Sequence, residues 1–149
     1  MSEVIKLGIA RKNNQKIEEI EVIEILEGKG IVGDRHFREN NDARKQITLI
    51  ESENIDDYNK KFNLNIPYLD FLRNIITKNI ELNNLIGKKL TIGKTEVEGI
   101  DLCRPCKNLQ ETLGHDNIIK EFLRKGGLRC KILVSGKIKL GDQIKLWKN

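Results

Sequence analysis

The sequence predicts a mainly β domain, a barrel or barrel-like structure with inserted helices. Short segments in which apolar and polar residues alternate recur along the chain, as is typical of strands with one buried face. Glycine-containing turns separate many of them, while apolar residues recur at helical spacing in only a few places. The length of 149 residues suits one core. We therefore expect residues 1–149 to form a single domain.

In the first half of the chain, the predicted strands span residues 4–10, 20–26, 46–50 and 72–77. A glycine-rich loop at 28–36 separates the second strand from the third. Residues 51–63 should form a helix, because Ile55, Tyr58 and Phe62 follow at spacings of four and three. Ser52 is the expected N-cap of this helix.

In the second half, the predicted strands span residues 88–92, 95–102, 128–134, 137–140 and 143–147, the first two forming a hairpin. A short turn or helix is expected at 81–86 and a helix at 107–113. A further helix at 117–125 should end at a Gly-Gly pair and turn four apolar side chains inward. These are Ile118, Ile119, Phe122 and Leu123.

Composition narrows the possible partners. The net charge of +5 and the pI near 9.1 permit an anionic ligand. With seven aromatic residues and no basic tract interleaved with them, a stacking surface for nucleic acid is not expected. The sequence shows neither an apolar run near the ~20 residues of a membrane span nor a signal peptide. We predict a cytoplasmic protein without membrane contact.

The most informative motif is Cys103-Arg104-Pro105-Cys106, between a predicted strand and a predicted helix. A thiolate is both a nucleophile and a metal ligand, and helix N–H groups and nearby cations stabilise it. Cys106 opens the helix between Arg104 and Lys107. The motif alone leaves redox chemistry, zinc and another metal open.

Two of these alternatives have limited support. A thioredoxin-like centre needs a later proline facing the two cysteines, and no proline follows Pro105. A structural zinc site would combine Cys103 and Cys106 with His115 and Cys130. It lacks a second Cys-x-x-Cys pair, and Cys130 shares strand parity with apolar residues that should point into the core.

A second constellation is the glycine-rich loop, whose end reads Gly30-Ile31-Val32-Gly33-Asp34-Arg35-His36. Flexible backbone N–H groups beside cationic or titratable side chains suit an anion or a polar heterocycle. Further planar donors for phosphate are available from Arg44, Arg73, Arg104 and Arg129. The loop is neither a Walker A motif nor a dinucleotide fingerprint.

These pieces form an ordered series that resembles the MOSC domain, the C-terminal domain of molybdenum cofactor sulfurases. The pieces lie, in order, at 30–36, 44–51, 73–75, 85–87, 90–93, 104–109, 127–133 and 136–142. The resemblance covers about residues 4–146.

The resemblance implies a strongly bent, barrel-like sheet, a molybdopterin-type cofactor and a functional cysteine. In related proteins this cysteine carries sulfur for the cofactor or ligates molybdenum, and by motif it is Cys106. Cys103 is an additional cysteine, expected to resolve a persulfide or to tune the site. The residues expected to contact the cofactor are Gly33, Asp34, Arg35, His36, Arg73, Asn74, Arg104 and Lys107.

The chain also departs from its best-known relatives. It lacks a pyridoxal-phosphate desulfurase domain, so a cysteine desulfurase or a molybdoenzyme is an expected partner. It lacks the N-terminal β domain of amidoxime reductases and reads Leu72-Arg73-Asn74 where those typically carry Arg-Pro-Asn. The main hypothesis is a cofactor-binding protein that handles sulfur or metal through Cys106. The alternatives are a molybdenum-dependent reductase of N-hydroxylated compounds, with an external electron donor, and a non-enzymatic carrier.

Overall fold

The computed structural model describes residues 1–13 and 16–147. The strands are β1 (Glu3–Ile9), β2 (Glu18–Ile20), β3 (Val22–Leu26), β4 (Gly30–Ile31), β5 (Ile47–Glu51), β6 (Ile75–Lys78), β7 (Lys89–Ile92), β8 (Thr95–Leu102), β9 (Leu128–Val134), β10 (Gly136–Lys139) and β11 (Ile144–Leu146). The helices are α1 (Ser52–Phe62), α2 (Lys107–Leu113) and α3 (Ile118–Glu121), with 3₁₀ turns η1 (Ala43–Lys45), η2 (Tyr68–Phe71) and η3 (Leu82–Leu85). The predicted mainly β class with inserted helices is confirmed.

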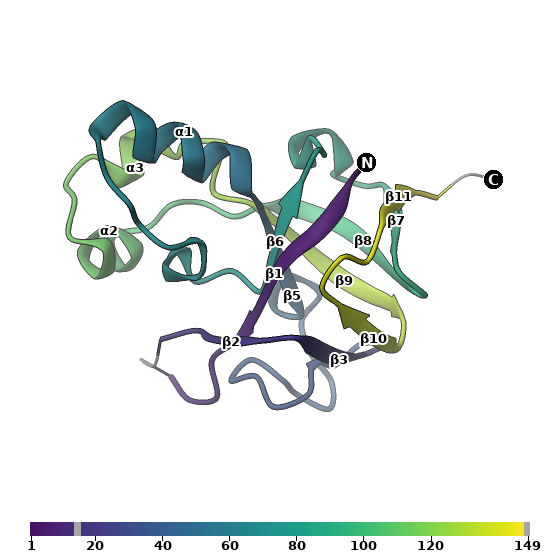
Figure 1. Ribbon diagram of the computed structural model, residues 1–149. Coiled ribbons are helices and arrows are strands. Elements are labelled where there is room, and N and C mark those ends of the chain that lie inside the picture. The colour runs from purple at the N-terminus through teal and green to yellow at the C-terminus, as the bar shows by residue number, and fades with distance from the viewer. Residues whose placement is uncertain (14–15, 148–149) are drawn as a thin grey trace.

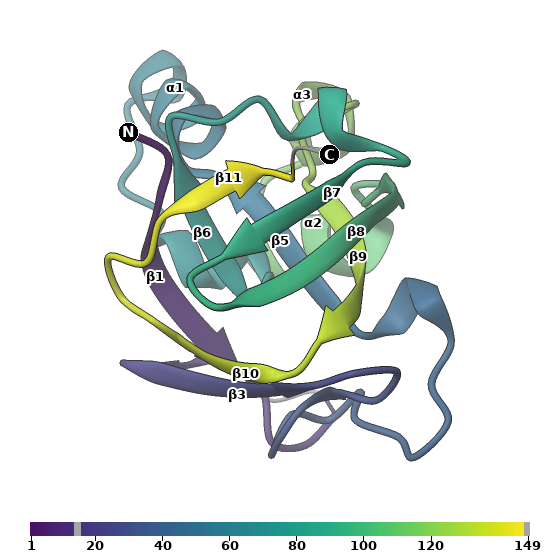
Figure 2. The same ribbon diagram turned by 90° about the vertical axis from the view of Figure 1, so that its right-hand side faces the viewer.

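A large sheet in the order β11-β7-β8-β9-β5-β6-β1-β2 faces a small sheet in the order β10-β3-β4. The large sheet is antiparallel except for β5 and β6, which pair in parallel and are connected through α1. Helices α1, α2 and α3 gather on one side of the large sheet, and β3 and β10 lie across its lower end (Figures 1 and 2).

The large sheet is bent rather than closed. Its β11 edge curls back toward β1, which is bonded to the segment just before β11. Val4 N–H donates to the Asp142 carbonyl at 2.9 Å, and Gly141 N–H donates to the Val4 carbonyl at 2.8 Å. These backbone bonds join two parts of the sheet that lie far apart in strand order. The predicted barrel-like bend is therefore present.

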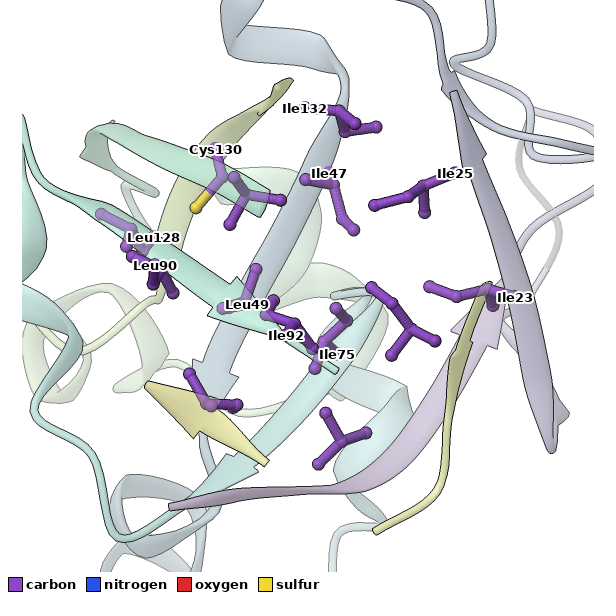
Figure 3. Close-up of a cluster of buried hydrophobic side chains, with 14 of the residues drawn as sticks. Ile23, Ile25, Ile47, Leu49, Ile75, Leu90, Ile92, Leu128, Cys130 and Ile132 are labelled. Carbon is purple, nitrogen blue, oxygen red and sulfur yellow. The ribbon is translucent and has the colours of Figure 1, made fainter. Parts of the chain in front are cut away.

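Two apolar cores lie on the two faces of the large sheet. Neighbouring residues of a strand point to opposite faces, so Leu49 joins the core inside the bend, while Ile50 packs against the helices. Figure 3 shows side chains of β3 and of the large sheet pointing toward one another in the first core. In the second core, Phe122 lies between Tyr58 of α1 and Phe71, with ring centroids 5.2 and 4.9 Å apart.

Four predicted details are wrong, for identifiable reasons. The predicted strand 20–26 is two strands, because β2 pairs with β1 in the large sheet, whereas β3 pairs with β10 in the small one. The predicted strand 72–77 begins only at Ile75, because Leu72 ends η2 in the left-handed region, at φ 65°.

The other two details concern helices. Glu51 rather than Ser52 is the N-cap of α1, because Ser52 is already the first helical residue and Glu51 has an extended backbone. The predicted helix 117–125 stops at Glu121. Beyond it the chain turns at Arg124, whose φ is 61°, and Leu123 is 61% exposed rather than inward.

Candidate functional site: a cationic cavity beside Cys106

A cavity of about 290 Å³ lies where four segments meet. They are the loop at 34–36, the chain from η1 into β5, the loop at 72–74 and the segment that leads from β8 into α2. The cavity is lined by Ile17, Asp34, Arg35, His36, Arg44, Lys45, Gln46, Ile47, Thr48, Leu72, Arg73, Asn74, Cys103, Arg104, Cys106, Asn108, Leu109 and Arg129. Its size is near the lower end of the ~300–1,000 Å³ typical of small-molecule sites.

Most of the predicted site residues come together here. Asp34, Arg35, His36, Arg73, Asn74, Cys103, Arg104 and Cys106 all line the cavity. Gly33 and Lys107 do not. The φ of Gly33 is +86°, so its part is to turn the loop that presents the next three residues. Lys107 is the exposed first residue of α2.

The two cysteines of the motif differ in access. Cys106 is exposed at the N-cap of α2, and its carbonyl accepts the Gln110 N–H at 3.0 Å. Cys103 is 5% exposed and donates its backbone N–H to the Gly127 carbonyl at 2.8 Å. A Cβ on Gly126 would meet the Cys103 carbonyl oxygen at 2.5 Å. Close approach of the two segments at this glycine therefore holds the cysteine loop in place.

Burial raises the pKa of the Cys103 thiol, and the nearby guanidinium groups of Arg73 and Arg129 offset this only in part. Burial also raises the pKa of Cys130, which is fully buried in the core as its strand parity predicts. Cys103 and Cys130 are therefore protonated packing thiols near neutral pH, and Cys106 is the thiol that faces solvent.

Asp34 holds the glycine-rich loop in place. Its carboxylate is buried and accepts the backbone N–H groups of Ala10 at 3.0 Å and His36 at 3.1 Å. His36 lies half-buried beside it. Burial first, and then the positive charge of Arg35, lower the pKa of His36, so its imidazole is neutral at pH 7.

Asn74 is likewise committed to the protein. Its Oδ1 accepts both the backbone N–H and the hydroxyl of Thr48 at 3.1 Å, and its Nδ2 donates to the Gly8 carbonyl at 3.1 Å. Next to it, Arg73 Nε donates to the Gly126 carbonyl at 2.8 Å. The loop at 72–74 therefore ties β1 and β5 to Gly126, which packs against the Cys103 carbonyl, and Arg73 lines the cavity.

The cavity is strongly cationic. Besides Arg35, Arg73 and Arg104, three side chains outside the main predicted set contribute, namely Arg44, Lys45 and Arg129. Among the residues that the structure describes, Asp34 is the only carboxylate in the lining. Converging guanidinium groups in a concave site attract and orient polyanions.

Sequence reasoning missed Lys45, Gln46, Thr48 and Asn108 as cavity residues. Thr48 carried a signal, because it is a polar residue within the apolar strand 47–50. Gln46 is buried, and its Oε1 accepts the Ile132 N–H at 2.8 Å. Its part is to join two strands under the cavity. Nothing in the local sequence distinguishes Lys45 or Asn108 from ordinary surface residues.

The zinc alternative is not supported by the geometry. Within residues 1–13 and 16–147, no three His, Cys, Asp or Glu side chains gather as a metal ion would need. A single thiolate remains a suitable ligand for a soft metal that is held mainly by its own organic cofactor.

Comparison with known families decides the relationship. Residues 32–145 match the family model of the MOSC domain. The chain belongs to the MOSC domain family. MOSC domains are associated with molybdenum cofactor binding and sulfurase-like function. The thioredoxin-like alternative is thereby set aside. Among curated protein sequences, no significant match is found.

Solved structures share the MOSC fold. The YuaD protein of Bacillus subtilis is 18% identical, with a TM-score of 0.82 over 98% of this chain and 96% of that chain. YiiM from Geobacillus stearothermophilus is 13% identical, with a TM-score of 0.79 over 99% and 76%. YiiM from Escherichia coli is 15% identical, with a TM-score of 0.70 over 97% and 71%. At such identities the likeness is one of fold alone.

Within the described part of the chain, no helix is both long enough and apolar enough to cross a membrane.

Proposed function

We propose that this protein binds the molybdenum cofactor, or a precursor of it, in the cationic cavity and handles sulfur or metal through Cys106. The observation that carries this proposal is the position of one exposed thiol, Cys106, on a cavity lined by six cationic side chains. A ligand that carries both an anionic group and a thiophilic metal matches this site, because the cationic side chains suit the anion and the Cys106 thiol suits the metal.

The residues present fit such a ligand. Arg35, Arg73 and Arg104 supply planar donors for the phosphate of a pterin cofactor, and Cys106 supplies a soft ligand. The salt-bridge geometry leaves Arg35 and Arg104 without a carboxylate partner among the described residues. When bound, the cofactor would supply a redox-active metal centre.

For sulfur handling, Cys106 would act as the acceptor of a sulfane sulfur. Its thiolate attacks the terminal sulfur of a donor persulfide, a new S–S bond forms at Cys106, and the donor cysteine leaves as a thiolate. The exchange conserves atoms and electrons. A cysteine desulfurase that carries a persulfide is the kind of donor this step requires.

Cys103 bears on the lifetime of that persulfide. Attack of the Cys103 thiolate on the inner sulfur would form a Cys103–Cys106 disulfide and release hydrosulfide. Because burial raises the Cys103 pKa, little thiolate is available for this attack. We infer that Cys103 tunes the site and is a slow resolving residue.

The test compares wild type with Cys106→Ala, each purified anaerobically from a host that makes the cofactor. The molybdenum-to-protein ratio and cyanide-labile sulfur after incubation with a persulfide donor are measured on both. We expect both signals to be lost in Cys106→Ala and kept in the control Cys103→Ala. Equal loading of wild type and Cys106→Ala would contradict the role of Cys106.

The same samples separate the alternatives within the proposal. Metal-loaded protein that reduces a hydroxylamino compound with a chemical electron donor would point to the reductase. Loading without turnover would favour the carrier.

A further inference from the structure

A second cavity, of about 460 Å³, adjoins the cationic one. Both are lined by Arg44, Cys103 and Arg104, so a shared wall separates them. Cys106, Arg35 and the loop at 72–74 line the first cavity but not the second. The second is bounded instead by the end of β8, the residue after η3 and the turn after α3.

The second cavity has apolar walls that are open to solvent. Ile86 is 45% exposed and Leu123 is 61% exposed, while the partly buried Leu102 and the buried Pro105 also line the cavity. Leu123 has the spacing of an inward-facing helix residue, yet the end of α3 and the turn at Arg124 direct it outward. Covering exposed apolar surface with an apolar group removes it from water, so binding of such a group in this cavity is favourable.

Cationic groups rim the apolar walls. Arg104 and Arg124 are exposed, and among the described residues neither makes an ion pair. Within residues 1–13 and 16–147, the only carboxylate in this lining is that of Asp101, which is already paired with Arg44 at 2.9 Å and Arg129 at 3.5 Å. The cavity therefore offers apolar contact and positive charge together.

We propose that this cavity is a second binding site, for a small molecule that combines an apolar body with one anionic group such as a carboxylate, sulfonate or phosphate ester. The apolar body lies against Ile86, Pro105 and Leu123, and the anion meets Arg104 and Arg124. This site does not depend on the proposed cofactor. Since Arg104 and Cys103 face both cavities, a ligand here lies directly beside the site of Cys106.

The test is a fluorescence titration with 8-anilino-1-naphthalenesulfonate and with its uncharged counterpart N-phenyl-1-naphthylamine. We expect the sulfonate to bind roughly fivefold more tightly than the neutral probe, the size of effect typical of an exposed ion pair. Leu123→Ser and Arg124→Gln should each weaken the sulfonate by at least about threefold. Lys125→Gln, which removes the same charge from the next residue, outside the cavity, should leave it unchanged.

Three outcomes would overturn the site. Equal affinity for both probes would show that the cavity does not recognise an anionic group. If Leu123→Ser and Arg124→Gln bound the sulfonate probe as tightly as wild type, the probe would bind outside this cavity. A loss confined to Arg35→Gln, which lines only the first cavity, would assign the probe to that cavity. None of these outcomes affects molybdenum or sulfur loading, so this inference and the proposed function fail separately.

Discussion

Thr48 and Asn74 exchange hydrogen bonds beneath the cationic cavity. The Thr48 hydroxyl donates to Asn74 Oδ1 at 3.1 Å and accepts the Asn74 backbone N–H at 3.1 Å. With the bond from Asn74 Nδ2 to the Gly8 carbonyl, one buried side chain holds β5, the loop before β6 and β1 together. Asn74, which the family resemblance assigns to cofactor contact, therefore also joins three parts of the backbone.

Asn74→Ala should therefore lower the free energy of unfolding by about 2–4 kcal/mol, because it leaves buried backbone groups of Thr48 and Gly8 unpaired. Urea unfolding measures this. Asn108→Ala, at an exposed cavity residue, is the control and should change stability by less than about 0.5 kcal/mol. A stable Asn74→Ala protein that has lost only its ligand would show that Asn74 acts by direct contact.

Gly126→Ala should disturb the cysteine loop, because the added Cβ would lie 2.5 Å from the Cys103 carbonyl oxygen. We expect a loss of about 1–3 kcal/mol in stability and a changed rate of Cys106 alkylation. Gly114→Ala is the control. Gly114 has φ +75° and open space around it, so an added Cβ there introduces backbone strain without a steric clash. If the two variants behaved alike, close packing at Gly126 would not be the cause.

The three cysteines should react very differently with a thiol reagent such as 5,5′-dithiobis(2-nitrobenzoate). Cys106 is exposed, whereas Cys103 and Cys130 are buried with raised pKa values. One thiol per chain should react rapidly in the native protein, and all three should react in denaturant. Rapid native labelling of Cys106→Ala would contradict the assignment.

Asp101→Asn should strengthen anion binding in the first cavity. The Asp101 carboxylate holds Arg44 and Arg129, two guanidinium groups that line that cavity, and so competes with any anion there. Removing its charge should raise the affinity for inorganic pyrophosphate roughly threefold to tenfold at low salt. Isothermal titration calorimetry tests this, with Glu98→Gln as a control that removes a carboxylate from the same strand. Unchanged affinity would mean that both arginines serve the fold alone.

Glu51→Gln should stabilise the protein at neutral pH. Burial raises the pKa of Glu51, partly offset by the Leu82 N–H that its Oε2 accepts at 3.3 Å. A carboxyl whose folded pKa lies above its unfolded value binds its proton more tightly when folded. It therefore favours the folded state at low pH and loses this advantage as pH rises through the folded pKa.

The stability difference between Glu51→Gln and wild type should accordingly grow as pH increases above about 4.5 and level off at less than about 1 kcal/mol. Thermal unfolding across that range measures it, with Glu96→Gln as the control. A difference that shrinks with rising pH would give the opposite sign for the pKa shift.

Local patterns in the sequence determined the element types, because strand and helix periodicities depend on neighbouring residues. The hairpin of β7 and β8, the helix after Cys106 and the burial of Cys130 follow from alternation, spacing and parity alone. The ordered motifs likewise predicted the family, and eight of the site residues that they indicated line one cavity.

Only the tertiary structure decided how those residues divide their work. Asp34 accepts the N–H of Ala10, just after β1, and Asn74 bonds to Thr48 of β5 and Gly8 of β1. These partners are distant in sequence, so no local pattern reveals them. Access decided between Cys103 and Cys106, because the fold buries Cys103 and leaves Cys106 exposed to solvent. The second cavity exists because the chain turns at Arg124 instead of continuing the helix, which places Leu123 beside Ile86 from the other half of the domain. Such choices depend on contacts between distant segments, which form only when the whole sheet has folded.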